Sequence, residues 1–201
     1  MKDHKTSCGA AVIDNKYLLT AKHCVGSTSD TTIYAMFKNG EILKAIEIKA
    51  IERIDLNVDL ALIKLERTID VETHIPICLA DPYNDFTTFT ATGWNYGTDM
   101  SIVETSVRKY PTENCRDEWQ QSKHEYILDE DKFCVVGDKH LTCDGSASGL
   151  LTKNVNSQNY LVGVAAITSC TDNLMNGYTD VSQFVAEINA NTRDAAGCRR
   201  Q

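Results

Sequence analysis

Eight cysteines are the feature of this 201-residue sequence that most restricts what it can fold into. None of them forms a C-x-x-C pair, the arrangement typical of zinc sites and thioredoxin-like redox sites. An even number of cysteines without such pairs indicates four disulfides in a secreted domain, because disulfides persist in oxidising compartments. The alternative is a reduced protein with its cysteines scattered through the core. We expect the disulfide-linked, extracellular protein.

Size and charge narrow the possible partners. A chain of this length suits one large all-β domain or two small barrels that share an interface. The formal net charge of −8 argues against non-specific binding to nucleic acid or to anionic membranes. No apolar run approaches the roughly 20 residues that span a bilayer. We therefore expect neither a nucleic acid nor a membrane as a partner.

Short apolar runs alternate with turn signals along most of the chain. Asp14-Asn15-Lys16 and Asn39-Gly40 each separate two such runs and are typical of hairpin turns. Residues 181–191 differ, because their apolar residues recur at helical spacing. This succession predicts an all-β fold of two antiparallel β-barrels, split near residues 76–89 and followed by a C-terminal helix.

Three stretches of the sequence are more specific than these patterns. They are Thr20–Cys24 (T-A-K-H-C), Asn57–Leu65 (N-V-D-L-A-L-I-K-L) and Cys143–Leu151 (C-D-G-S-A-S-G-L-L). Together they resemble the motifs T-A-A-H-C, N-D-I-A-L-L-K-L and C-x-G-D-S-G-G-P-L of the trypsin-like serine peptidases. The resemblance extends from Cys8 to about Asn191.

The resemblance implies the fold in more detail. It implies one trypsin-like domain over residues 1–201, with a first barrel at about 1–78, a second at about 88–180 and a helix at about 181–191, each barrel of the six-stranded type. The family has a further strand ahead of the position of Cys8, and seven residues precede that cysteine here. Met1–Lys5 is polar and has no apolar signal region. Either a signal and further residues were removed, or the sequence begins inside a longer precursor. We expect the second, with a truncated N-terminal strand.

The same alignment places the residues of a serine peptidase site. His23 falls on the catalytic histidine and Asp59 on the carboxylate that orients it. Ala147 falls on the nucleophilic serine, and Gly145 and Ala147 fall on the residues of the oxyanion hole. Ser146 replaces the buried aspartate that pairs with a newly cut amino terminus in the family. An alanine methyl group cannot attack a carbonyl, so the resemblance implies a protease frame without its chemistry.

The specificity pocket implied by the resemblance is altered as well. Leu141 stands where trypsin-like members carry an aspartate, so a bound Arg or Lys side chain would meet no counter-charge. The pocket wall, S-W-G in the family, reads Ala166-Ile167-Thr168. Asn176 stands where the family has a glycine, and its side chain, like that of Thr168, should fill space in the pocket.

A second alignment of the nucleophile loop stays open. Deleting one residue after Gly145 would place Ser146 on the nucleophile and would leave an active endopeptidase. That alignment needs a compensating insertion before Leu151. The insertion would fall inside the nucleophile loop, whose geometry must be fixed for the nucleophile to meet its base. An engineered loss of the serine at position 147 would also be compatible with an active family member.

The resemblance also implies disulfide pairs. Family positions give Cys8–Cys24, Cys115–Cys134 and Cys143–Cys170. Cys78 and Cys198 remain, and two alternatives stay open for them. They pair with each other, or each is free because its partner segment lies upstream. The even number of cysteines favours pairing.

Clusters of charged residues are interpreted as solvated surface. Glu41, Glu47 and Glu52 lie among lysines, and the loop that binds calcium in some family members looks too short here. The charged stretch between Cys115 and Cys134, which includes Asp131, is interpreted in the same way. We predict no metal and no cofactor.

The segment Ile75–Leu79 (I-P-I-C-L) is typical of arthropod clip-type proteases and their non-catalytic homologues, which this chain resembles most. The resemblance implies a secreted, catalytically inactive, monomeric serine protease homologue. Such a protein would bind extracellular proteases or their substrates, as a regulator or cofactor of an immune cascade of the melanisation type. The alternatives are an active trypsin-like endopeptidase and a decayed gene product without a selected role.

Overall fold

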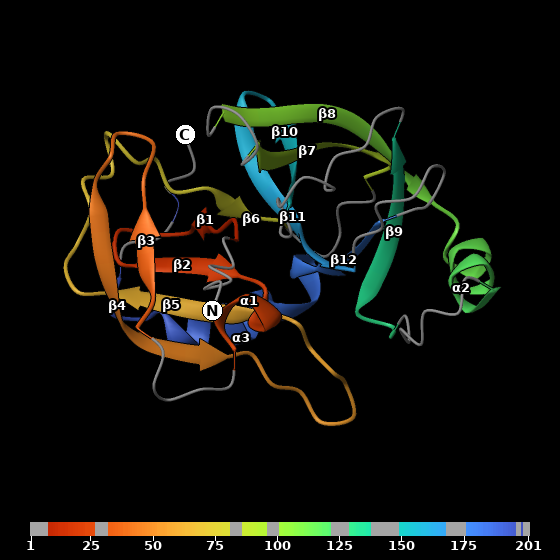
Figure 1. Ribbon diagram of the computed structural model, residues 1–201, viewed down its shortest axis with the longest axis horizontal. Coiled ribbons are helices and arrows are strands. Elements are labelled where there is room, and N and C mark those ends of the chain that lie inside the picture. Colours follow the sequence, from red (N-terminus) through yellow and green to blue (C-terminus); the bar gives the residue numbers. More distant parts are fainter. Residues whose placement is uncertain are drawn as a thin grey trace, which may run out of the picture.

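The computed structural model describes residues 8–26, 32–80, 86–95, 101–121, 129–137, 149–167, 176–195 and 198. Its first sheet is antiparallel, in the order β1-β2-β5-β4-β3. The strands are β1 (Ala11–Val12), β2 (Tyr17–Thr20), β3 (Tyr34–Met36), β4 (Ile42–Ala50) and β5 (Ala61–Leu65). Figure 1 shows this sheet on the left, beside the second sheet on the right.

The second sheet closes on itself. Its order is β10-β7-β8-β9-β12-β11-β6, and β10 also pairs with β11, so six strands form a ring. The strands are β6 (Cys78–Leu79), β7 (Thr88–Asn95), β8 (Ser101–Tyr110), β9 (Lys132–Gly137), β10 (Leu150–Val155), β11 (Gln158–Ile167) and β12 (Asn176–Asp180). Only β6 is parallel to its neighbour in this sheet, within the described part of the chain.

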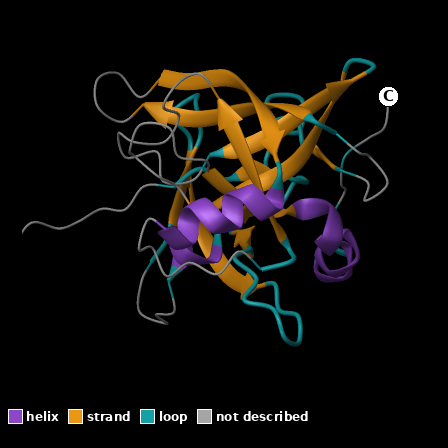
Figure 2. Cartoon of the chain, turned by 90° about the vertical axis from the view of Figure 1, so that its right-hand side faces the viewer, coloured by secondary structure: helices purple, strands orange, loops and turns teal. Residues whose placement is uncertain are grey.

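Few helices accompany the strands, and Figure 2 shows them on the outside of the sheets. They are α1 (Lys22–Val25), α2 (Thr112–Gln121), the 3₁₀ helix η1 (Val181–Phe184) and α3 (Val185–Asn191). The Asp180 side chain caps η1 by accepting a hydrogen bond from the Ser182 N–H. The predicted all-β fold of two antiparallel barrels with a C-terminal helix is confirmed, although the described residues supply five strands to the first barrel rather than six.

The two C-terminal helices, η1 and α3, pack over the junction between the two sheets. Leu19 and Leu62 of the first sheet, Leu161 and Val164 of the second, and Phe184 of η1 belong to one buried cluster. The buried apolar side chains of 181–191 belong to this cluster and therefore face both barrels at once, which accounts for their helical spacing. Each barrel also has an interior cluster of its own.

Both predicted hairpin turns have a specific chemical cause. The Oδ1 atom of Asp14 accepts the backbone N–H groups of Lys16 and Tyr17, each at 2.7 Å, and so holds the turn before β2. Gly40 has a φ of +85°, a left-handed conformation that its lack of a Cβ atom allows. It follows Asn39 between β3 and β4, where the sequence predicts a hairpin.

Three disulfides lie within the described residues, and each has Cα atoms within the roughly 7 Å that a bridge requires. The Cα–Cα distances are 6.0 Å for Cys8–Cys24, 6.4 Å for Cys115–Cys134 and 4.9 Å for Cys78–Cys198. The last pair joins the beginning of β6 to the C-terminal end of the chain, so the alternative of two free thiols does not hold. The proposed Cys143–Cys170 pair lies outside the described residues. No helix in the described ranges is long and apolar enough to cross a membrane.

Candidate functional site

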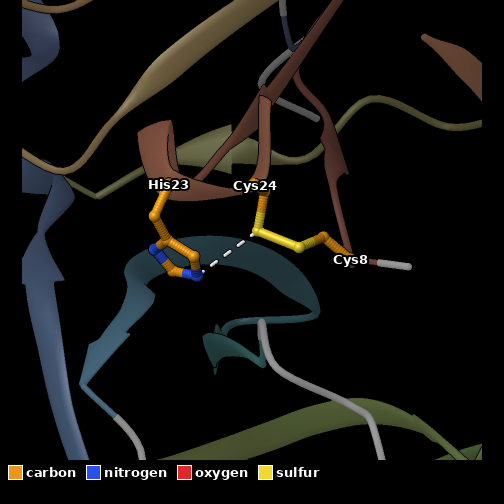
Figure 3. A group of neighbouring side chains, drawn as sticks. All are labelled: Cys8, His23 and Cys24. Carbon is orange, nitrogen blue, oxygen red and sulfur yellow. Dashed lines mark hydrogen bonds between the residues drawn. A yellow bond between two sulfur atoms is a disulfide. The ribbon is translucent and has the colours of Figure 1, made fainter. Parts of the chain in front are cut away.

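His23 is held on a short helix whose neighbours are fixed on both sides. Ala21, fully buried, ends the extended segment from β2, and its carbonyl accepts the Cys24 N–H at 3.1 Å. Cys24 is cross-linked to Cys8, and Val25 is buried in the interior of the first barrel. These contacts fix the backbone of α1, while 43% of the His23 side chain stays exposed. Figure 3 shows the imidazole beside the disulfide.

Asp59 lies in the extended segment that leads into β5. Val58 and Leu60, on either side of it, are both buried in the cluster between the sheets. Alternation in an extended chain then turns the Asp59 side chain to the opposite side, toward His23. The Asp59 side chain is 18% exposed, so it is much less hydrated than that of His23.

The Asp59 carboxylate contacts His23 through both of its oxygens. Oδ1 accepts the backbone N–H of His23 at 2.9 Å, and Oδ2 lies 2.7 Å from the ring Nδ1. An ionised carboxylate can only accept, so the proton of this second bond belongs to Nδ1. In the neutral ring Nε2 is then the basic nitrogen, which is the tautomer that a histidine general base requires.

The cluster of Cys8, His23 and Cys24 has the atom types of a metal site but not the chemistry. Its potential ligand atoms all lie within 4.8 Å of one another. The two sulfurs, however, are bonded to each other, as Figure 3 shows, and neither is a thiolate. One imidazole remains, at 3.5 Å from the Cys24 sulfur. These residues do not fit a metal ion.

The structure therefore brings together two of the predicted catalytic residues, His23 and Asp59. Several other predicted residues of the nucleophile loop, the pocket and the third disulfide lie outside the described part of the chain, namely Leu141, Cys143, Gly145, Ser146, Ala147, Thr168 and Cys170. The end of the nucleophile motif is described. Gly149 is buried and its carbonyl accepts the Ala165 N–H of β11 at 2.9 Å, which ties the exit of that loop to the second barrel.

Three predicted pocket residues are described, at the facing ends of β11 and β12. Ala166 lies at an irregularity in the register between Ala165 and Ile167, and Asn176 pairs with Val135 of β9. Ile167 is buried against the Cys115–Cys134 disulfide, so its side chain contributes to packing beside α2. Asn176 is half-buried. Their roles as pocket residues stay predictions.

One buried ion pair near the site is missed by the sequence analysis. Asp131 is fully buried and Lys132 is 8% exposed, with Lys132 Nζ at 2.8 Å from Asp131 Oδ1. The interpretation of the charged stretch up to Asp131 as solvated surface is therefore wrong at this residue. The signal that could have found the pair is its place directly before the apolar strand of Phe133–Val136.

Comparison with known proteins agrees with this architecture. A family model described as Trypsin matches residues 1–188. The chain is 26% identical over 182 residues to bovine coagulation factor XI, covering 79% of this chain and 29% of that protein. It is also 26% identical over 173 residues to serine protease filzig of Drosophila melanogaster, covering 73% of this chain and 10% of that protein. The chain thus spans less than a third of the length of these curated relatives. Because the family model covers most of its length, the chain belongs to the trypsin family.

Proposed function

We propose that this chain is a secreted, catalytically inactive member of the trypsin family that acts by binding other proteins. The observation that carries the proposal is Ala147 at the nucleophile position, in a motif whose ends, Cys143 and Leu151, align without a gap. Acyl transfer by this mechanism needs a hydroxyl that the histidine can deprotonate. His23 and Asp59 are paired in the required tautomer, but alanine offers no such hydroxyl.

Two further replacements support the loss of catalysis. Ser146 carries no charge and cannot form the ion pair by which the family's aspartate shapes the oxyanion hole. Leu141 offers no counter-charge to a basic substrate side chain. Nucleophile, activation switch and pocket are thus altered at separate positions.

A surface on the first barrel supports protein binding. Tyr34, Met36, Ile42 and Ile46 on β3 and β4 are between 54% and 60% exposed, and Met36 pairs directly with Ile42. Exposed apolar patches on a folded domain mark contact sites for other proteins. One relative is named as a coagulation factor and the other as a serine protease. We infer that the partners are extracellular proteases or their substrates, and that a monomer regulates their cascade.

The disulfides support an extracellular location. Three cross-links are present in the described residues, and such bonds are rare in reducing compartments. The immune role of the clip-type homologues is the part of the proposal that rests on the sequence resemblance alone.

A specific observation favours the second candidate, an active endopeptidase with Ser146 as its nucleophile. The 2.7 Å contact between His23 Nδ1 and Asp59 Oδ2 is the arrangement that a working base requires. Under this candidate the pair would remain in use.

Active-site labelling separates the two candidates. The purified protein is incubated with a serine-directed phosphonate and a broad set of fluorogenic peptides, and adducts are located by mass spectrometry. We expect no adduct and no turnover above buffer. An adduct on Ser146 that disappears in Ser146→Ala would establish the endopeptidase instead.

Capture from extracellular fluid tests the binding surface. The wild-type protein should retain a defined protein that the Met36→Asp/Ile42→Asp variant does not retain. Ile54→Asp is the matched control, because Ile54 is 88% exposed and lies outside β3 and β4. No captured protein, or equal capture by all three, would favour the decayed gene product or another surface.

A further inference from the structure

A buried cation stands at the start of β9. Lys132 is 8% exposed, and its Nζ lies 2.8 Å from Asp131 Oδ1 and 3.4 Å from Asp129 Oδ2. The Asp131 carbonyl in turn accepts the Asp180 N–H at 2.8 Å, so this corner of the second barrel is fixed. A buried ammonium group is costly unless it is paired and hydrogen-bonded, and here it has charged partners.

The third contact of this amine crosses to the other barrel. Lys132 Nζ donates to the backbone carbonyl of Asn57 at 3.1 Å. Asn57 lies two residues before Asp59, in the segment 57–60, which belongs to no strand. The cation of the second barrel is therefore joined to the backbone that carries the carboxylate facing His23.

A second cation, Arg53, ties the beginning of the loop from Arg53 to Asn57 to the C-terminal helices η1 and α3. The Nε atom of Arg53 donates to Glu187 Oε1 at 3.1 Å. Its Nη2 atom donates to the same oxygen and to the Gln183 carbonyl. Its guanidinium lies 4.5 Å from the centroid of the Phe184 ring. The loop from Arg53 to Asn57 is thus held at both ends by residues of the second half of the chain.

We propose that Lys132 is a positioning residue for the His23–Asp59 pair. The Asp59 carboxylate meets two fixed donors, the His23 N–H and Nδ1–H, at 2.9 and 2.7 Å. A shift of the segment by a fraction of an ångström would lengthen one of these bonds. By fixing the Asn57 carbonyl, Lys132 selects the position in which both form. This assignment holds whether or not the chain is catalytic.

The competing explanation is that the buried Val58 and Leu60 side chains suffice to place Asp59. Lys132→Met separates the two, with ¹⁵N-labelled protein observed by NMR. The readouts are hydrogen exchange of the His23 backbone N–H and the low-field resonance of its Nδ1 proton. We expect exchange to become faster by about tenfold or more and the Nδ1 resonance to broaden or be lost, since local opening controls both. Lys38→Met, at an exposed turn residue, is the control and should leave both readouts unchanged.

Removing Lys132 alone leaves the Asp131 carboxylate buried without its partner, which could unfold the protein. The variant Asp131→Asn/Lys132→Met removes both charges and keeps the shape, and it should show the same change at His23 with the fold retained by circular dichroism. If both variants fold and His23 stays as protected as in the wild type, the assignment is wrong.

A measurement on the unmodified protein covers the case in which neither variant folds. In native-state hydrogen exchange at low urea, the His23 amide and the β9 amides should open in one event. Opening in separate events would contradict the coupling.

Discussion

Position 147 is an alanine. Under the proposed function it is the nucleophile position, so its methyl group offers no hydroxyl proton for the Nε2 atom of His23 to remove. The structure leaves this histidine with an intact Asp59 partner. Catalytic residues that act as a unit lose most of their effect when one is missing, so the remaining pair has little catalytic consequence by itself.

Restoring the hydroxyl should not restore the enzyme. We expect Ala147→Ser to give little or no peptide hydrolysis, because under the proposed function Ser146 cannot anchor an amino terminus, and Leu141 and Thr168 stand at altered pocket positions. Assays with a broad fluorogenic peptide set measure this directly. Robust cleavage by the single variant would show that switch and pocket are functional.

Ionisation of Asp14 makes the free energy of unfolding depend on pH with a sign that is unusual for a carboxylate. Burial raises the pKa of Asp14 from 3.8 to about 6, although two backbone N–H groups oppose the rise. The folded state therefore binds this proton more tightly than the unfolded state. The contribution of Asp14 to the free energy of unfolding is present below about pH 4 and is lost as the pH rises to about 6.

We expect Asp14→Asn to be more stable than the wild type at pH 7, by about 3 kcal/mol, because the amide keeps the acceptor without the buried charge. Near pH 3 the two proteins should unfold at the same urea concentration. Asp117→Asn, at an exposed helix position, is the control. Equal stabilities at pH 7 would contradict the raised pKa of Asp14.

At the scale of elements, the segment after α3 is bound to the first barrel by charge. Asp194 accepts hydrogen bonds from Lys64 Nζ and from the Tyr17 hydroxyl, each at 2.8 Å. The Lys64 amine and then the Tyr17 hydroxyl lower the pKa of Asp194 to about 2. β2 and β5 thereby hold the C-terminal end of the chain.

The sign for Asp194 is the reverse of that for Asp14. A lowered pKa stabilises the fold above the ordinary value of 3.8, and this contribution is lost as the pH falls toward 2. Asp194→Asn should therefore unfold at lower urea concentration than the wild type at pH 7, while the difference should vanish near pH 2. A difference that persists there would assign the effect to packing instead of charge.

The Cys78–Cys198 disulfide fastens the same end of the chain. It joins residues 120 positions apart, whereas Cys8–Cys24 joins residues 16 apart. A longer closed loop restricts the unfolded chain more, by about 4–5 kcal/mol against about 3 kcal/mol. In urea unfolding, Cys78→Ser/Cys198→Ser should therefore be more destabilising than Cys8→Ser/Cys24→Ser. The opposite order would mean that strain or residual structure outweighs chain entropy at these bridges.

At the scale of the whole molecule, local patterns predict much of the fold. The Asn39-Gly40 turn and the helical spacing of 181–191 depend on neighbouring residues, and both are present in the structure. The His23–Asp59 contact is predicted only through a motif, because 36 residues separate the partners. Contacts between the halves leave little local signal. Arg53 reaches Glu187 across 134 positions, and the buried Lys132 is marked in the sequence by its place directly before the apolar strand of Phe133–Val136.

Under the proposed function, the chain retains a base, His23, and its carboxylate, Asp59, without a nucleophile. Comparing the rate of peptide hydrolysis by the wild-type protein with that of His23→Ala under identical conditions tests this combination. A base with no hydroxyl to deprotonate contributes nothing, so we expect the same background rate for both proteins. A wild-type rate more than about a hundredfold above that of His23→Ala, a typical contribution of a general base, would contradict it.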